Sequence, residues 1–275
     1  MPPQLLKNVF TTAAIDNIDH NPSATSAKSA FHGTCTSIFQ HPSSSNEGES
    51  RDIPFSFSGN SNKVPELPLA YTNVAPAHLD IKKAKPTPVV NIDLPSLSLY
   101  DQHFKSGFDW LESVNVTSTF NGSHAVTWSA FHAKDVRTRN FQTSIISMLP
   151  LLHEAAHSIS TLKHLMGHVI KMTSYLNPGQ TAVIAADQPV YACMKQVQWQ
   201  WPEECGESKA VIMLGGLHIE MAIDSILGSL LQSSGWSSAF SDSEVSTSGR
   251  ADSFLAGSHV CRTREAHQIA VCALC

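Results

Sequence analysis

The sequence predicts an α/β fold, in which helices flank a β-sheet. The first observation is a series of short apolar, β-prone runs at residues 8–16, 31–40, 124–133, 181–187 and 209–218. The second is the presence of segments with helical periodicity between the later runs. The resulting order is strand, strand, insert, strand, helix, strand, helix, strand, helix, which is typical of layered α/β proteins. The third is size and composition, because 275 residues with 42% hydrophobic content allow a substantial core.

The first part of the core is predicted at residues 1–42. "VFTTAAID" (9–16) and "FHGTCTSIFQ" (31–40) have the β-branched and aromatic content of strands, and Asn21-Pro22 between them suits a wide hairpin. We expect the first strand to end at Asp16.

A long insert or linker is predicted at residues 43–123. Its first part is rich in Ser, Pro, Gly and Asn, as in "HPSSSNEGESRD" and "SFSGNSNKVPELPLA". Such composition buries little apolar surface, so residues 43–95 are expected to be irregular and peripheral.

The remainder of the core is predicted at residues 124–235. "HAVTWSAFHA" (124–133) suits a strand. A helix is expected from Leu149 to Leu176, because Leu151, Ala155, Ile159, Leu162, Met166 and Val169 form an apolar stripe at helical spacing. A short helix is expected at 191–199. Another is expected after residue 218, with its apolar face formed by Ile219, Ile223, Ile226, Leu227 and Leu230. Residues 236–275 are expected to be a Ser-rich loop and a helical segment cut short by truncation.

Composition excludes some classes of function and favours an intracellular protein. The formal net charge of −5 argues against a chain that binds nucleic acid through bulk electrostatics, although a local basic groove remains compatible with it. No signal peptide or membrane-spanning run is evident, so no membrane association is expected. The six cysteines show no framework spacing and are expected to be reduced.

Two histidine-containing motifs suggest zinc, but each lacks part of a zinc site. "HEAAH" matches the zinc-peptidase signature through His153, Glu154 and His157, yet no third ligand follows at a suitable spacing. The alternative is a solvated polar helix face, and the spacing favours it because His164, His168 and Lys171 continue the same stripe. The C-terminal segment ends in one C-x-x-C, formed by Cys272 and Cys275. Three further candidate ligands precede it: His259, Cys261 and His267. A single C-x-x-C is weak evidence for a zinc site.

A third constellation consists of acids at the ends of predicted strands. Asp16 ends the first strand, Asp187 ends a later buried strand, and Glu220 opens a helix after a strand and a glycine turn. Acids converging at strand ends would repel unless they bind a cation such as Mg²⁺ or Mn²⁺. They are equally compatible with turns and with an acidic helix N-terminus. Spacing alone leaves both interpretations open.

The predicted element order and several short blocks point to a family resemblance. The blocks are "DNIDHN", "FHGTCTSIFQHP", "LNPGQ", "ADQPVYACMKQVQW", "LGGLHIEMA" and "SGRADSFLAGSHVCRTREAH". They resemble uncharacterised animal open reading frames derived from mobile elements. The element order resembles the ribonuclease H-like fold of DDE-type transposases and nucleases, whose metal-binding acids lie on the first strand, the fourth strand and the last helix.

The resemblance implies a two-metal phosphodiester cleavage or strand-transfer site, with DNA as a partner and a nuclear location. Asp16 and Asp187 would bridge the metals and Glu220 would complete the site. Asp19, His20 and His218 would orient the ligands or the substrate, with Asp224 as a further candidate acid. The rival expectation is a non-enzymatic remnant or interaction protein that keeps the fold without the chemistry, because no DNA-binding motif precedes Asp16.

Overall fold

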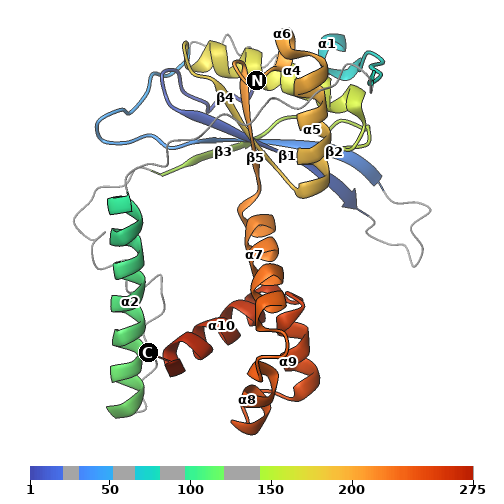
Figure 1. The fold of residues 1–275 in the computed structure, drawn as a ribbon. Helices are drawn as coiled ribbons and strands as arrows, with labels where there is room; N and C mark the ends of the chain where they lie inside the picture. The colour runs from blue at the N-terminus through green and yellow to red at the C-terminus, as the bar shows by residue number, and fades with distance from the viewer. Residues whose placement is uncertain (21–30, 52–65, 81–96, 121–142, 275) are drawn as a thin grey trace. The chain divides into compact units, whose positions relative to one another are not determined.

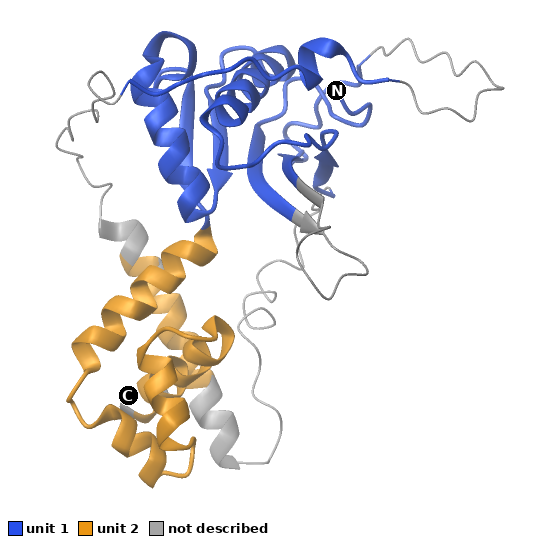
Figure 2. Cartoon of the chain, turned by 90° about the vertical axis from the view of Figure 1, so that its right-hand side faces the viewer, with its two compact units in different colours: residues 1–88, 141–215 blue, residues 89–140, 216–275 orange. Residues whose placement is uncertain are grey.

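The computed structural model describes residues 1–20, 31–51, 66–80, 97–120 and 143–274. They form two compact units (Figures 1 and 2). The N-terminal unit comprises residues 1–88 and 141–215, and the C-terminal unit comprises residues 89–140 and 216–275. The strand predicted at 124–133 and much of the predicted insert lie outside the described residues.

A mixed sheet forms the centre of the N-terminal unit and confirms the α/β prediction (Figure 1). Within the described residues its order is β3-β2-β1-β4-β5. β1 pairs antiparallel with β2 and parallel with β4, while β2–β3 is antiparallel and β4–β5 is parallel. The strands are β1 (Thr11–His20), β2 (Phe31–Gln40), β3 (Ile145–Met148), β4 (Ala182–Ala186) and β5 (Ala210–Leu214).

Two helices cover one face of this sheet and enclose the main core. α4 (Ile159–Leu176) packs against β1 and β4, and α5 (Gln188–Gln200) packs against β4 and β5. Side chains alternate between the faces of a strand, and Ile15, Ile38 and Ile184 accordingly point into the buried core. Burying each such side chain contributes about 1.5–3 kcal/mol. The short α1 (Leu69–Thr72) and α6 (Pro202–Cys205) flank this layer.

The opposite face of the sheet is open within the described residues of the N-terminal unit. Ile146 and Met148 of β3 are exposed, as are Val211 and Met213 of β5. Because these residues alternate with buried ones along each strand, the buried and exposed sides of the sheet are unambiguous.

The predicted helix from Leu149 begins ten residues later than expected, at Ile159. Residues before it continue along the edge of β2, where the Leu149 and Leu152 amides donate to the carbonyls of Thr36 and Thr34 at 2.9 and 3.1 Å. The helix starts only where the Ser158 hydroxyl accepts from the Thr161 amide as an N-cap. The predicted stripe is therefore correct from Leu162 onward, whereas Leu151 and Ala155 are exposed.

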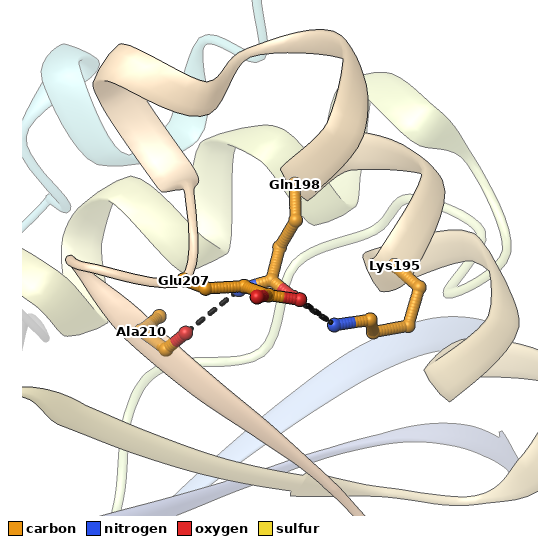
Figure 3. A network of polar contacts seen from close by, with 4 residues as sticks. All are labelled: Lys195, Gln198, Glu207 and Ala210. Carbon is orange, nitrogen blue, oxygen red and sulfur yellow. Dashed lines mark hydrogen bonds and ion pairs between the residues drawn. The ribbon is translucent and has the colours of Figure 1, made fainter. Parts of the chain in front are cut away.

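A buried polar contact joins α5 to β5 (Figure 3). The Gln198 side chain is almost fully buried, and its Nε2 donates to the Ala210 carbonyl at 2.7 Å. Lys195 Nζ donates to Gln198 Oε1 at 2.8 Å and to Glu207 Oε1 at 2.7 Å. These bonds fix the start of β5 against the helix that follows β4.

Helices make up the described part of the C-terminal unit. They take the place of the Ser-rich loop predicted after residue 235, and they confirm the helical segment predicted toward the C-terminus. They are α2 (Leu97–Phe120), α7 (Gly216–Leu231), α8 (Trp236–Asp242), α9 (Ser248–Leu255) and α10 (Val260–Leu274). α2 also falls inside the segment predicted as an insert. Phe240, Ala251, Phe254 and Ala266 form a small core. Of the serines that suggested a loop, Ser238 of α8 and Ser248 of α9 are exposed, whereas Ser241 of α8 is partly buried.

α7 packs through a face that the sequence pattern did not indicate. Its buried residues are Asp224 and Gly228, and the Gly228 backbone lies so close to α9 that an added Cβ would be 1.6 Å from the Leu255 carbonyl oxygen. The predicted apolar face is largely exposed instead, with Ile226 at 61% and Leu230 at 74% exposure. Within the described residues, this apolar face is therefore not the face through which α7 packs.

Candidate functional site

Asp16 and Asp187 occupy equivalent places on two neighbouring strands. The parallel pairing of β1 with β4 runs from Thr12–Val183 to Ile15–Ala186, and the two aspartates follow the last pair directly. Neighbouring strands are about 4.8 Å apart. Since Ile15 points into the core, alternation turns the Asp16 side chain toward the opposite face of the sheet. Asp187 follows the last residue of β4 and begins the turn into α5. β1 and β4 therefore lie side by side and parallel in one sheet.

Asp16 does not end a strand, contrary to the prediction. β1 continues to His20 and stays paired with β2, where Asp16 lies opposite Cys35. The Asp16 side chain is exposed, and its Oδ1 accepts from the Asn17 amide at 2.8 Å. The interpretation of residues 16–20 as a turn is therefore wrong. Asp19 and His20 are strand residues by their main chain, and their side chains lie outside the described part of the structure.

Asp187 is the N-cap of α5. Its Oδ1 accepts from the Val190 amide at 2.9 Å, which satisfies one of the free donors of the first helical turn. A carboxylate has two oxygens and about four acceptor positions, so capping leaves capacity for a cation. The negative charge of Asp187 also affects a neighbouring thiol. Burial raises the pKa of Cys193, and the charge of Asp187 raises it further. Asp187 thus has a structural role, and its carboxylate still has acceptor positions that could bind a cation.

Glu220 belongs to α7 of the C-terminal unit, where it pairs with Arg264 of α10. Arg264 Nε donates to Oε1 and Nη2 to Oε2, both at 2.6 Å. These hydrogen bonds lower the pKa of Glu220. His218, also on α7, is partly exposed. Both oxygens of Glu220 therefore have a cationic partner within its own unit.

The remaining acid of α7, Asp224, is buried. Its side chain is 6% exposed and, across the described residues, its Oδ2 has no hydrogen-bond partner. Burial raises the pKa of Asp224. Nε2 of His267 on α10 is likewise buried without a partner in the described chain. The sequence indicated Asp224 as a candidate metal-site acid and His267 as a candidate zinc ligand, but it gave no signal that these two atoms are buried.

Across the described residues, no three or more His, Cys, Asp or Glu side chains form a cluster able to hold a metal ion. The strongest candidate is thus a two-carboxylate pair, Asp16 and Asp187, whose closeness rests on strand register. Carboxylate oxygens are the ligands that Mg²⁺ and Mn²⁺ prefer.

"HEAAH" lacks the helical geometry that its motif requires. Residues 153–157 precede α4, so His153 and His157 are not one helical turn apart, although both are exposed as expected. Glu154 is held by its main chain, whose carbonyl accepts from Thr34 Oγ1 at 2.7 Å. The motif therefore has no peptidase geometry in this fold.

The other two histidines of the predicted solvated stripe hold a neighbouring segment in place. Nε2 of His164 lies 2.8 Å from the Tyr71 carbonyl, and Nε2 of His168 lies 3.1 Å from the Ala70 carbonyl. Burial and the nearby His164 lower the pKa of His168. These side chains fix α1 against α4, so the prediction of a wholly solvated face is wrong here.

In the C-terminal segment, His259 and Cys261 are exposed. The side chain of Cys272, and Cys275, lie outside the described residues, so the C-x-x-C site stays untested.

The described fold defines a mixed α/β unit with paired aspartates, followed by a helical unit. A family model described as "Domain of unknown function (DUF8702)" matches residues 127–275. Because this match spans more than half of the chain, the chain belongs to that family. Asp187 and Glu220 lie inside the matched region, and Asp16 lies outside it.

No curated protein and no solved structure matches the chain. Among the described helices, none has the length and hydropathy needed to cross a membrane.

Proposed function

We propose that the N-terminal unit is a ribonuclease H-like domain that binds Mg²⁺ or Mn²⁺ at Asp16 and Asp187. The ancestral activity would be metal-dependent cleavage or strand transfer of DNA phosphodiesters. One observation carries the proposal: the β3-β2-β1-β4-β5 order, with an aspartate directly after the last residue pair of the parallel β1–β4 register. The third strand behind the resemblance was predicted at residues 124–133, outside the described residues, and the third described strand is β3 at Ile145–Met148.

Electrostatics favours a cation at this pair. Two carboxylates at equivalent places on neighbouring strands repel each other, and a divalent ion between them removes that repulsion. The cap to Val190 holds the Asp187 side chain in one orientation, which lowers the entropy lost when a ligand binds. When two metal ions are bound at such a site, they stabilise the attacking and leaving oxygens of a phosphodiester.

Glu220 and His218 lie on α7 of the C-terminal unit, where Glu220 is paired with Arg264. The proposed metal site is limited to Asp16 and Asp187 of the N-terminal unit. Asp19 and His20 remain proposed orienting residues.

A second candidate function is supported by the partners of these acids. Asp187 caps α5, and Glu220 forms a bidentate ion pair with Arg264, so both acids have structural roles without metal. A non-enzymatic interaction protein that retains the fold would show these same contacts.

Thermal melts of the full chain with and without Mg²⁺ distinguish the two. The wild type should gain stability with Mg²⁺, because a ligand that binds only the folded state raises the melting temperature. Asp187→Asn should lose the gain, since an amide is a poorer metal ligand but still a good N-cap. Glu154→Gln is a matched control, an exposed acid on the same unit, and should keep it.

Cleavage of a labelled DNA duplex and of a single strand then tests the activity. Turnover that requires metal and is lost in Asp187→Asn supports the enzyme. A metal-induced shift without turnover supports a metal-binding remnant. Four identical melting curves, for wild type and Asp187→Asn with and without Mg²⁺, contradict the proposal.

A further inference from the structure

A cavity of about 310 Å³ lies between α4 and residues 70–77 of the N-terminal unit. Near the start of α4, Ser160 Oγ accepts from the Ala77 amide at 2.8 Å and donates to the Ala77 carbonyl at 3.2 Å. Further along the helix, His164 and His168 each bond a carbonyl of α1. Because these hydrogen bonds fix both walls, the cavity is formed before a ligand binds, as most small-molecule sites are.

The lining of this cavity has a surplus of positive charge. It includes the bases Lys163, His164, His168 and Lys171, and among the lining residues that the structure describes Glu204 is the acid. Glu204 is paired with Lys163, since its Oε2 lies 3.1 Å from Nζ. No hydrogen bond or ion pair joins the exposed Lys171 to a described residue. The sequence of α4 contains no Asp or Glu, although the chain has a formal net charge of −5.

The two imidazoles can add to this charge when an anion is present. Each faces a carbonyl oxygen with Nε2, so Nε2 carries the proton and Nδ1 of the neutral ring has none. Burial, His164 and Lys171 lower the pKa of His168, because each of them disfavours a further positive charge. Burial raises the pKa of Tyr71 to about 12, so this neighbouring phenol is uncharged. An anion in the cavity would favour the protonated imidazole and so promote proton uptake at Nδ1.

We propose that this cavity binds a small organic phosphate monoester, whose head group pairs with Lys171 and with protonated His168. A phosphate monoester carries a charge of about −1.5 to −2 near neutral pH and has three strong acceptor oxygens. Ammonium and imidazolium groups are matching charge-assisted donors. The cavity is near the lower size limit of small-molecule sites, about 300 Å³, which favours a small body. The proposal does not depend on a metal at Asp16 and Asp187.

Isothermal titration of the full chain with three probes at one ionic strength tests the proposal. The probes are glycerol 3-phosphate, inorganic phosphate and glycerol, which represent the ester, the head group alone and the body alone. We expect glycerol 3-phosphate to bind most tightly, inorganic phosphate more weakly, and glycerol not measurably. Inorganic phosphate that binds as tightly as the ester overturns the assignment of an organic ligand. Absence of binding by glycerol 3-phosphate overturns the proposal as a whole.

Two variants assign the binding to Lys171. Lys171→Gln should weaken glycerol 3-phosphate binding at least about tenfold, through loss of a charge-assisted hydrogen bond. Lys209→Gln removes the same charge from an exposed position of the same unit outside the cavity, and it should keep the wild-type affinity. Circular dichroism confirms that both variants are folded. Wild-type affinity in Lys171→Gln, or an equal loss in Lys209→Gln, overturns the proposal.

The pH dependence of binding tests the role of His168. His168→Gln keeps a donor for the Ala70 carbonyl but cannot be protonated. Between pH 7.5 and 6.5, the affinity of the wild type relative to this variant should rise by up to about tenfold, the limit for uptake of one proton. Ionisation of the ligand is common to both proteins and cancels in the comparison. Identical pH profiles of the wild type and His168→Gln overturn the assignment of His168.

Discussion

Replacing Asp187 separates its role as a helix cap from its role as a charge beside Asp16. Asp187→Asn keeps an N-cap acceptor of nearly equal quality, whereas Asp187→Ala removes it at a cost of about 1 kcal/mol. Both changes remove the repulsion between the two carboxylates. For two charges separated by the strand spacing of about 5 Å, the repulsion is about 1 kcal/mol in a water-like dielectric and about 3 kcal/mol at an effective dielectric constant of 20. The lower figure applies, because Asp16 is exposed and Asp187 is partly exposed.

The expected order of stability without metal follows from these terms. Loss of the charge at the α5 N-terminus costs about 0.3–1 kcal/mol and offsets most of the relieved repulsion. Asp187→Asn should therefore be equal to the wild type or slightly more stable, and Asp187→Ala should be about 1 kcal/mol less stable than Asp187→Asn. With Mg²⁺ at ten times its dissociation constant, the wild type alone should gain about 1.4 kcal/mol.

Hydrogen exchange of β4 and α5 peptides, in EDTA and in Mg²⁺, measures these differences within the N-terminal unit. Equal protection of the Asn and Ala variants in EDTA would refute the capping contribution. An equal Mg²⁺ gain in the wild type and the Asn variant would refute the metal role of Asp187.

Three further predictions concern packing and pH. Gly228→Ala should destabilise the C-terminal helices by about 1–3 kcal/mol in denaturant unfolding through overpacking against α9. The control Gly249→Ala, with open space at its Cβ, should stabilise by up to about 1 kcal/mol. Gln198→Leu should cost about 1–3 kcal/mol in the same assay, because a buried carbonyl loses its donor. Burial raises the pKa of Asp224 above its unfolded value, so the folded state gains stability as pH falls through the raised pKa toward the ordinary value of an aspartate. Asp224→Asn should remove that part of the pH dependence in thermal melts.

The strands were the most predictable part of the fold. β2 agrees with its predicted range, and β4 and β5 lie within theirs, because short β-branched, apolar runs between breakers have few alternatives. The start of α4 was less predictable, since Leu151 and Ala155 continue its period while their backbone lies beside β2. Ser158 was the local signal for the helix start, and tertiary pairing outweighed the apolar period before it.

The site was predictable only as far as it follows from strand register. Two acids after apolar runs predicted the neighbouring places of Asp16 and Asp187, which β1–β4 pairing then defined. The partner of Glu220 was not predictable, because Arg264 is far away in sequence and arrives through the packing of α10 on α7. The buried Asp224 was equally hidden, since α7 buries the face that holds its acids and glycine rather than its most apolar face.

Counting bound Mn²⁺ by electron paramagnetic resonance tests the paired-aspartate site most directly, because free Mn²⁺ gives a strong signal that is lost on binding. Titration of the wild-type chain should remove at least one equivalent of free Mn²⁺. Asp16→Asn and Asp187→Asn should each abolish that uptake, while Glu154→Gln should preserve it. Uptake that is absent in the wild type, or unchanged in both aspartate variants, would contradict a metal site at the end of the β1–β4 register.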